Sequence, residues 1–220
     1  MPQAIELCKI VAGLQPNHVG AAAHVMLACR QDCNIDPNMI KIISAKFNTL
    51  TYKTISPLRG WPAGANGMFA STMIHISNNL VKHYECVYWM EPDAIPICPN
   101  WFTNLVNEWR RRHASVMVMG CRHDCDGNGK GDHITGCAVY HPNIARIYPP
   151  ITSSQGMAWD YQHRAKIVAF GKHTPLIENW YRATNAPVGI LDRVKVGVNI
   201  IHGHKDLSVV NHVKKKFNIK

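Results

Sequence analysis

The sequence predicts a single α/β domain in which helices flank a mainly parallel sheet. Short apolar runs alternate with segments of helical periodicity along the chain, which favours parallel strands joined by crossover helices. Apolar residues make up 46% of the composition and charged residues 17%, as in globular proteins. A length of 220 residues is enough for one sizeable core. We therefore expect one domain over residues 1–220.

The first part of the chain is expected to alternate between helices and strands. Residues 3–14 place Ile5, Leu7, Cys8 and Val11 on roughly one face of a helix. Turn residues crowd segment 57–66. Short apolar runs predict strands over 24–29, 39–44 and 85–90, and a helix is expected over 68–81.

The second part repeats this alternation. Asn100 is a candidate N-cap for a helix that ends near Arg112. Beyond it we expect strands over 115–121, 133–140 and 196–201, helices over 157–170 and 207–217, and a polar, glycine-rich loop over 122–132.

Charge and composition narrow the classes of partner. No run approaches eighteen apolar residues, and the N-terminal segment carries Glu6 and Lys9 among its apolar residues. We therefore expect no membrane span, no secretion signal and a cytoplasmic location, which is the host cytoplasm if the protein is viral. Eight dispersed cysteines are then expected as reduced thiols. The net charge of +10 favours an anionic partner, such as nucleic acid, a membrane surface or a phosphate-bearing donor.

Two carboxylates follow the expected strand over 85–90. In the segment Glu91-Pro92-Asp93, the proline ends strand pairing and favours an extended conformation at Glu91. Alternation then puts both acids on one side, where their oxygens suit Mg²⁺ or Mn²⁺ shared with a pyrophosphate. Read by itself, the pair is also compatible with a solvated acidic turn.

The run from Tyr88 to Trp109 resembles the GT-A glycosyltransferases, in the small form met in tailed-bacteriophage genomes. It is similar to that family's Asp-x-Asp motif followed by a proline, a tryptophan and a helix. The resemblance implies that Asp93 binds the metal and that Glu91 holds the ribose or a metal-bound water, or contributes to the metal site. A glutamate as the first acid departs from the family pattern.

Three further segments agree with this resemblance in order and spacing. The segment 60–66 resembles the donor-side loop and makes Gly60, Trp61 and Asn66 candidates for cofactor binding. The segment 133–142 resembles the strand whose glycine, here Gly136, faces the sugar and the acceptor. The segment 199–206 resembles the C-terminal His-Gly-x-Lys-Asp signature. It implies His202 as a metal ligand, with His204 in reserve, and Lys205 at the diphosphate.

The family pattern also implies a base and a donor. Asp160 lies where GT-A enzymes carry the acid that deprotonates the acceptor in an inverting reaction, although it could instead stabilise a helix N-terminus. Trp159 either stacks on a ligand or fills the core. Asp32 is a candidate contact to the nucleotide, with UDP as the default. GT-A folds normally open with a strand, but here a helix is expected almost at the start, an atypically short N-terminus, so that strand is either dispensed with or supplied by another element. Residues 1–93 would form the nucleotide-sugar half and 94–220 the acceptor half.

Other metal sites remain open from the residues alone. Cys121, Cys125, His133 and Cys137 have spacings compatible with zinc. Segment 124–129 also resembles the start of a calcium loop, but Thr135 stands where that loop needs a glutamate.

Basic clusters at 110–112 and 214–216 suggest a surface that follows phosphates. With the phage resemblance, they point to DNA carrying a hydroxymethylated pyrimidine as the sugar acceptor. Such a base must leave the duplex, and Trp61 or Trp159 could stack on it. The alternatives are a cell-envelope or protein acceptor, and a non-catalytic nucleic-acid-binding protein on a transferase-like fold.

Overall fold

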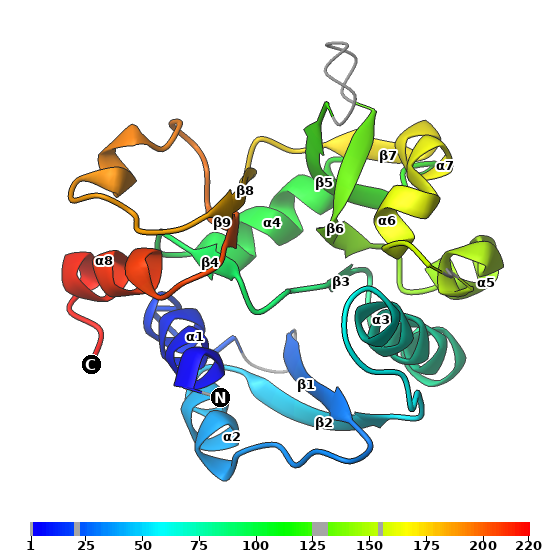
Figure 1. Ribbon diagram of the computed structural model, residues 1–220, viewed down its shortest axis with the longest axis horizontal. Helices are drawn as coiled ribbons and strands as arrows, with labels where there is room; N and C mark the ends of the chain where they lie inside the picture. The colour runs from blue at the N-terminus through cyan, green and yellow to red at the C-terminus, as the bar shows by residue number, and fades with distance from the viewer. Residues whose placement is uncertain (1, 20–22, 125–131, 154–155) are drawn as a thin grey trace.

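The computed structural model describes residues 2–19, 23–124, 132–153 and 156–220 (Figure 1). The helices are α1 (Pro2–Gly13), α2 (Pro37–Ser44), α3 (Ala63–His75), α4 (Trp101–Arg110), α5 (Ile144–Ile147), α6 (Trp159–Gln162), α7 (Arg164–Ala169) and α8 (Ser208–Phe217). A π-helical segment, η2 (Ile76–Leu80), continues α3, and two 3₁₀ turns are η3 (Pro149–Thr152) and η4 (Ile190–Arg193). The strands are β1 (His24–Arg30), β2 (Asn48–Thr54), β3 (Val87–Tyr88), β4 (Ala94–Pro96), β5 (Val118–His123), β6 (His133–Tyr140), β7 (Gly171–His173), β8 (Ile177–Ala183) and β9 (Ile200–His204).

The described strands form three sheets, with the orders β1-β2, β3-β6-β5-β7 and β4-β9-β8. Parallel pairs are β1–β2, β5–β7 and β8–β9, whereas β3–β6, β5–β6 and β4–β9 are antiparallel. The expected α/β class is therefore confirmed, but the described sheets are mixed and parallel pairing does not dominate. For β5 and β6 the reason is local, because the nine positions between them are fewer than a parallel crossover needs.

Segment 39–44, expected as a strand, is part of helix α2. Asp36 caps this helix, since its Oδ1 accepts a hydrogen bond of 2.8 Å from the Asn38 N–H, and Pro37 occupies the first turn. Met39, Ile42 and Ile43 then recur at helical spacing, and Ile43 is buried. The partner of β1 is instead β2, which the sequence reading missed.

Most other elements are confirmed with shifted ends. The helix expected over 68–81 begins earlier, as α3, and ends in η2. The one expected over 157–170 divides into α6 and α7, and the strand expected over 85–90 is reduced to β3. Asn100 directly precedes α4, but it has a φ of 60° and makes no side-chain capping bond. Strands β4, β7 and β8 were not expected.

Two apolar clusters form the core. One joins α1, α2, α4 and α8 to strands β4 and β9, and the other lies between α3, β6 and helices α5 to α7. Figure 1 shows this division, with α1, α2 and α8 at one side of the molecule and α3, α5, α6 and α7 at the other. Strand β6 is one of the two inner strands of the four-stranded sheet, and every one of its residues is buried.

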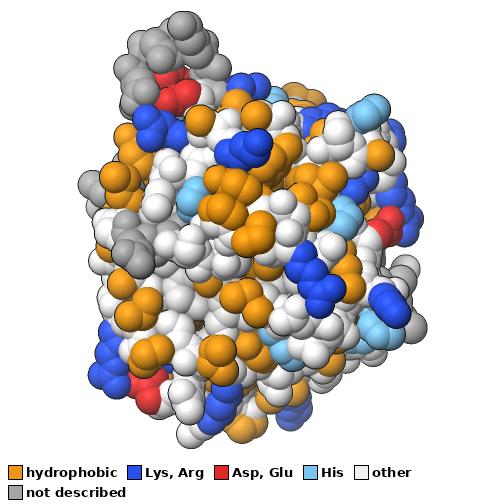
Figure 2. Space-filling view, turned by 90° about the vertical axis from the view of Figure 1, so that its right-hand side faces the viewer, with side chains coloured by type: hydrophobic (Ala, Val, Ile, Leu, Met, Phe, Trp, Pro, Cys, Tyr) orange, Lys and Arg blue, Asp and Glu red, His pale blue; other side chains and the backbone are white. Residues whose placement is uncertain are grey.

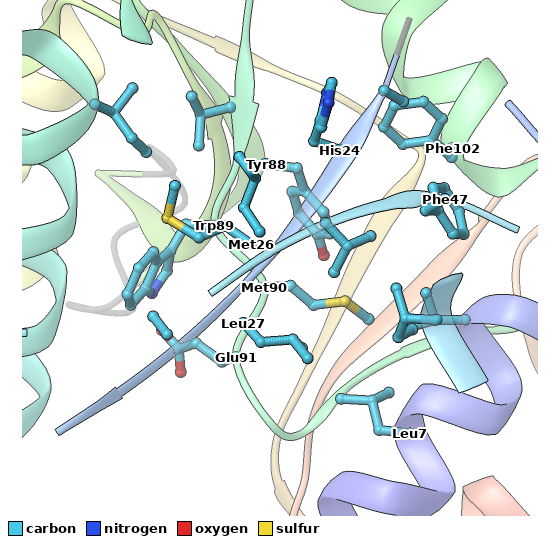
Figure 3. A pocket seen from close by; sticks show the side chains of 18 of the residues that line it. Leu7, His24, Met26, Leu27, Phe47, Tyr88, Trp89, Met90, Glu91 and Phe102 are labelled. Atoms are coloured by element: carbon cyan, nitrogen blue, oxygen red, sulfur yellow. The ribbon is translucent and has the colours of Figure 1, made fainter. Parts of the chain in front are cut away.

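A cavity of about 1310 Å³ separates β1 from the segment 83–92. Its walls are mainly apolar, and Figure 3 shows Met26 and Leu27 of β1 facing Trp89 and Met90 across it. Glu91, the first of the two acids, also lines this cavity, so its side chain is next to the cavity interior.

Candidate active site

Glu91, Asp93 and His202 converge at one point, although 109 positions separate the last two along the chain. Nε2 of His202 lies 3.4 Å from Oε2 of Glu91 and 3.6 Å from Oδ1 of Asp93. One ligand atom from each of the three side chains can be chosen so that all lie within 4.8 Å of one another. The spatial meeting implied by the family resemblance is thus present.

Strand pairing explains this meeting. After β3, the backbone turns at Pro92, and the Ala94 N–H donates to the Glu91 carbonyl at 3.0 Å. Ala94 then pairs with His202 in the antiparallel β4–β9 ladder. The Gly203 N–H donates to the Asp93 carbonyl at 3.3 Å. This bond holds the segment that carries Glu91 and Asp93 beside the segment that carries His202.

The donor set fits a divalent cation. Asp93 and His202 are buried, with 6% and 8% of their surface exposed, while Glu91 is more accessible. Two carboxylates and one imidazole suit Mn²⁺, and Mg²⁺ is compatible with the oxygen ligands. Nδ1 of His202 is buried and has no hydrogen-bond partner among the described residues, so the contacts of the ring are made through Nε2.

Lys205 lies beside this group rather than apart from it. Its ammonium forms an ion pair with Oδ2 of Asp93, and its side chain is half-exposed. The positive charge of Lys205 can therefore balance the negative charge of the two carboxylates, or the side chain can turn toward an anionic ligand.

Asp160 forms a second cluster close to the first. Its Oδ2 accepts a hydrogen bond of 2.8 Å from the Gly136 N–H and lies 3.1 Å from Nε2 of His133. Its Oδ1 accepts a bond of 3.0 Å from the N–H of Tyr161. Burial raises the pKa of Asp160, but the hydrogen bond and charge of His133 and the two backbone donors outweigh it, so the pKa is lowered overall. Asp160 is therefore held as a carboxylate.

Gly136 connects the two clusters. A Cβ at this position would lie 2.6 Å from the Trp159 ring and 3.1 Å from Oε1 of Glu91. Only glycine lets Glu91, the Trp159 ring and the backbone donor to Asp160 come so close together.

Asn66 and Trp159 have structural contacts that the sequence did not reveal. Oδ1 of Asn66 accepts a bond of 3.0 Å from the Trp159 N–H, and its Nδ2 donates to the Met157 carbonyl at 2.6 Å. Asn66 thereby positions the start of α6, which carries Asp160. The Trp159 ring is buried and stacks on Phe69 with centroids 4.2 Å apart, so it belongs to the core.

Of the remaining donor-side candidates, Gly60 lines the cavity, whereas Trp61 and Asp32 do not. Gly60 has a φ of 70° and lines the same cavity as Glu91. Trp61 is 76% exposed. Asp32 is engaged by two arginines, with Arg59 Nη2 at 2.6 Å and Arg30 Nε at 3.1 Å. The structure does not bring Asp32 or Trp61 into the cluster of Glu91, Asp93 and His202.

The alternative metal sites gain no support from the described residues. Cys125 and segment 125–129 lie outside them. Cys121 and Cys137 are buried in β5 and β6, and the Cys137 thiol lies 3.0 Å from the Tyr88 hydroxyl. Burial raises the pKa of the Cys137 thiol, which opposes the thiolate form that zinc needs. The seven described cysteines are unpaired.

Sequence reasoning missed His133 and His123 as neighbours of the expected base. Nδ1 of His133 lies 3.2 Å from Nε2 of His123, and the two residues are direct partners in the β5–β6 ladder. The sequence offered one signal for a shared contact, which is that His133 and Gly136 lie three positions apart at the start of one strand. It could not show that both contact a carboxylate 24 or more positions away.

The close approach of Gly203 to the backbone of Trp180 can be tested by substitution. The φ of Gly203 is 96°, and a Cβ there would lie 3.1 Å from the backbone of Trp180. Gly203→Ala is therefore expected to lower the free energy of unfolding by about 2 kcal/mol and to weaken Mn²⁺ binding. Gly197→Ala is the matched control, because Gly197 has a φ of 92° but open space around it. Urea unfolding and calorimetric Mn²⁺ titration measure both effects. Equal losses in the two variants would contradict the role of the close contact at Gly203.

No helix in the described ranges is long and apolar enough to cross a bilayer. No protein-family model matches the chain, and neither does any curated protein sequence. Among solved structures, the apo form of mouse xyloside xylosyltransferase 1 superimposes with a TM-score of 0.56 over 92% of both chains, at 9% sequence identity. This similarity shows that the chain shares the fold of a glycosyltransferase.

Proposed function

We propose that this protein is a metal-dependent glycosyltransferase that moves a sugar from a nucleotide-diphospho-sugar to a hydroxyl acceptor. The observation that carries the proposal is the meeting of Glu91, Asp93 and His202 beside the Asp160 cluster. The shared fold with a xylosyltransferase supports it. The GT-A class, with an inverting outcome, fits this arrangement of a metal-binding group next to a separate carboxylate base.

Each cluster has a distinct chemical task in this proposal. A bound Mn²⁺ or Mg²⁺ would neutralise charge on the departing diphosphate. Asp93 and His202 would hold that ion together with Glu91, and Lys205 would turn from Asp93 to the diphosphate. Asp160 would accept the proton of the acceptor hydroxyl while the acceptor oxygen bonds to the anomeric carbon. The bond from that carbon to the diphosphate breaks, and its electron pair leaves with the diphosphate.

The donor test is a screen of sugar nucleotides, with UDP-sugars first and UDP-xylose among them. Release of the nucleoside diphosphate is measured with Mn²⁺ and again with a chelator. Turnover that requires the metal supports the proposal. If no sugar nucleotide is bound or turned over while the protein binds DNA tightly and in a salt-dependent way, the protein is a non-catalytic binder.

We place a hydroxymethylated pyrimidine in DNA as the acceptor. The excess of 24 Lys and Arg over 14 Asp and Glu supports an anionic acceptor. Figure 2 shows basic side chains spread over the face that carries α3 and α5 to α7, with few acidic ones. The two clusters noted in the sequence contribute less, because Arg110 and Arg111 pair with Glu85 and Glu108, and Lys214 pairs with Glu6.

The acceptor test compares incorporation of a labelled sugar into hydroxymethylcytosine-containing DNA and ordinary DNA. Incorporation into the modified DNA alone supports this acceptor. Metal-dependent hydrolysis of the donor without incorporation into either DNA would leave the transferase proposal intact. It would point instead to a cell-envelope glycan or a protein side chain.

Of the two tryptophans considered for stacking on an extruded base, Trp61 is the accessible one, because Trp159 is buried and Trp61 is 76% exposed. Trp61→Ala is expected to raise the KM for modified DNA about 10-fold, since stacking on one base contributes about 1–3 kcal/mol. Hydrolysis of the donor in the absence of DNA should stay unchanged. Val188→Ala, at another exposed apolar position, is the control. A raised KM for the donor instead would assign Trp61 to the nucleotide.

A further inference from the structure

The carboxylate of Asp160 has most of its hydrogen-bonding capacity in use. A carboxylate offers about four lone-pair positions. Oδ2 engages both the Gly136 N–H and His133, and Oδ1 accepts the Tyr161 N–H. Among the described residues, one position on Oδ1 is left for a further donor. Since the side chain is 15% exposed, a hydroxyl from outside can reach only a small part of it.

The fold makes this arrangement possible at one place along β6. Strand β3 stays beside β6 only as far as the hydrogen bond from the Trp89 N–H to the Ala138 carbonyl. On the other edge, the β5–β6 register shifts between Gly120 and Arg122, opposite the same stretch. The Gly136 N–H therefore turns to Asp160 instead of to a neighbouring strand.

His133 is held as firmly as the carboxylate it contacts. Its side chain is 8% exposed, and its ring lies between that of His123, with centroids 4.6 Å apart, and that of Tyr161, at 5.9 Å. Because an ionised Asp160 can only accept, Nε2 of His133 carries the proton that points to it, and Nδ1 faces His123.

The surrounding charges are balanced around this pair. Asp132, which precedes β6, and His202 of β9 act electrostatically on His123 of β5. The Tyr140 hydroxyl of β6 is coupled to Asp160, and Arg164 of α7 stacks on the Tyr161 ring. Arg164 and Asp132 also pair with each other at 3.6 Å. His133 is thus the cationic or proton-donating side chain in direct contact with the Asp160 carboxylate among the described residues.

We infer that His133 is a positioning residue that keeps Asp160 ionised and directs its remaining Oδ1 lone pair toward the acceptor hydroxyl. This inference rests on the proposed transferase function and adds a residue that acts through the base without touching the substrate. The proton taken from the acceptor arrives on Oδ1 of Asp160 and must leave to water before the next turnover. Contact with His133 favours the loss of this proton, because it stabilises the ionised carboxylate of Asp160 over the protonated form.

Three variants test the inference. His133→Leu removes the donor, whereas His133→Gln keeps an N–H donor without a titratable ring. His141→Gln alters another partly buried histidine, just beyond the far end of β6. Carboxyl ¹³C chemical shifts of labelled aspartate, with the Asp160 signal identified from Asp160→Asn, give the pKa of Asp160 without any need for turnover.

We expect His133→Leu to raise the pKa of Asp160, and His133→Gln to raise it less. In the transfer reaction, His133→Leu should lower kcat about 30-fold and leave the donor KM unchanged. The acid limb of the pH–activity profile of this variant should move to higher pH. The reason is that Asp160 is active as a base only when ionised, so activity falls as the pH drops through the pKa of Asp160. His133→Gln should recover most of kcat, and His141→Gln should resemble the wild type.

The outcomes separate this inference from the proposed function. An unchanged Asp160 pKa in a folded His133→Leu protein overturns the inference, even if sugar transfer is active. Equal loss of kcat in the Leu and Gln variants, with a lowered melting temperature in both, also overturns it, because the role is then structural. A raised Asp160 pKa in a protein that transfers no sugar confirms the contact and refutes only the function.

Discussion

Asp93→Asn is expected to lower kcat for metal-dependent sugar transfer about 1000-fold, which corresponds to about 4 kcal/mol in the activation free energy. Asp93 is buried, lies 3.6 Å from Nε2 of His202, and pairs with Lys205 through its other oxygen. Replacing one carboxylate oxygen by an amide removes the charge that would hold the cation. It also leaves the Lys205 ammonium without its partner. Calorimetric titration with Mn²⁺ should show binding too weak to measure.

A matched control is available for this change. Asp192→Asn makes the same chemical replacement on the exposed turn η4, away from both clusters, and should bind Mn²⁺ as the wild type does. Glu91→Gln should have a smaller effect than Asp93→Asn, because Glu91 is more exposed and lies at the edge of the cavity. Full metal-dependent activity in Asp93→Asn would contradict the assigned metal centre.

Asp160→Asn is expected to lower kcat by a similar factor, about 1000-fold, while Mn²⁺ and donor affinities stay near those of the wild type. General base catalysis contributes about 10²–10⁴-fold, and the asparagine amide cannot take the acceptor proton. The amide oxygen can take the position of Oδ2 and still accept from the Gly136 N–H and His133, whereas the bond from the Tyr161 N–H is lost, so the melting temperature is measured alongside activity. Single-turnover transfer and donor titration measure the two effects separately.

The control for this variant is Asp36→Asn. Asp36 caps α2, and asparagine is an equally good N-cap, so neither stability nor activity should change. Unchanged transfer by Asp160→Asn would place the base elsewhere. Loss of donor binding in the same variant would show that Asp160 only supports Gly136 and Glu91.

The presence of two acids after a strand could be predicted from sequence because its signals are local, although a turn at Pro92 and Asp93 replaces the expected extended alternation. Pro92 ends the strand pairing of the preceding segment, and Glu91 and Asp93 follow directly. The glycine of the signature at His202 was implied by the family resemblance, and the structure gives the reason for it, since Gly203 takes a φ that other residues avoid. The strand that starts at His133 was predicted with its observed bounds, and it contains Ile134, Thr135, Val139 and Tyr140, which are residue types that favour strands.

Segment 39–44 shows where local pattern was insufficient. A short apolar run is compatible with a strand or a buried helix, and the cap at Asp36 with Pro37 decided for the helix. The antiparallel pairing of β4 with β9 also had no local signal, so a mainly parallel sheet was expected where the sheets are mixed.

The sequence by itself determined which side chains could do chemistry: two acids after a strand, a histidine before a glycine, and an aspartate at the start of a helix. The tertiary structure decided which of them meet. It placed His202 beside Asp93, joined His133 to Asp160, and buried Trp159 while leaving Trp61 exposed. The physical reason is that propensity and periodicity act over a few residues. The choice of strand edges and the removal of water from a side chain depend on contacts between segments far apart in the chain.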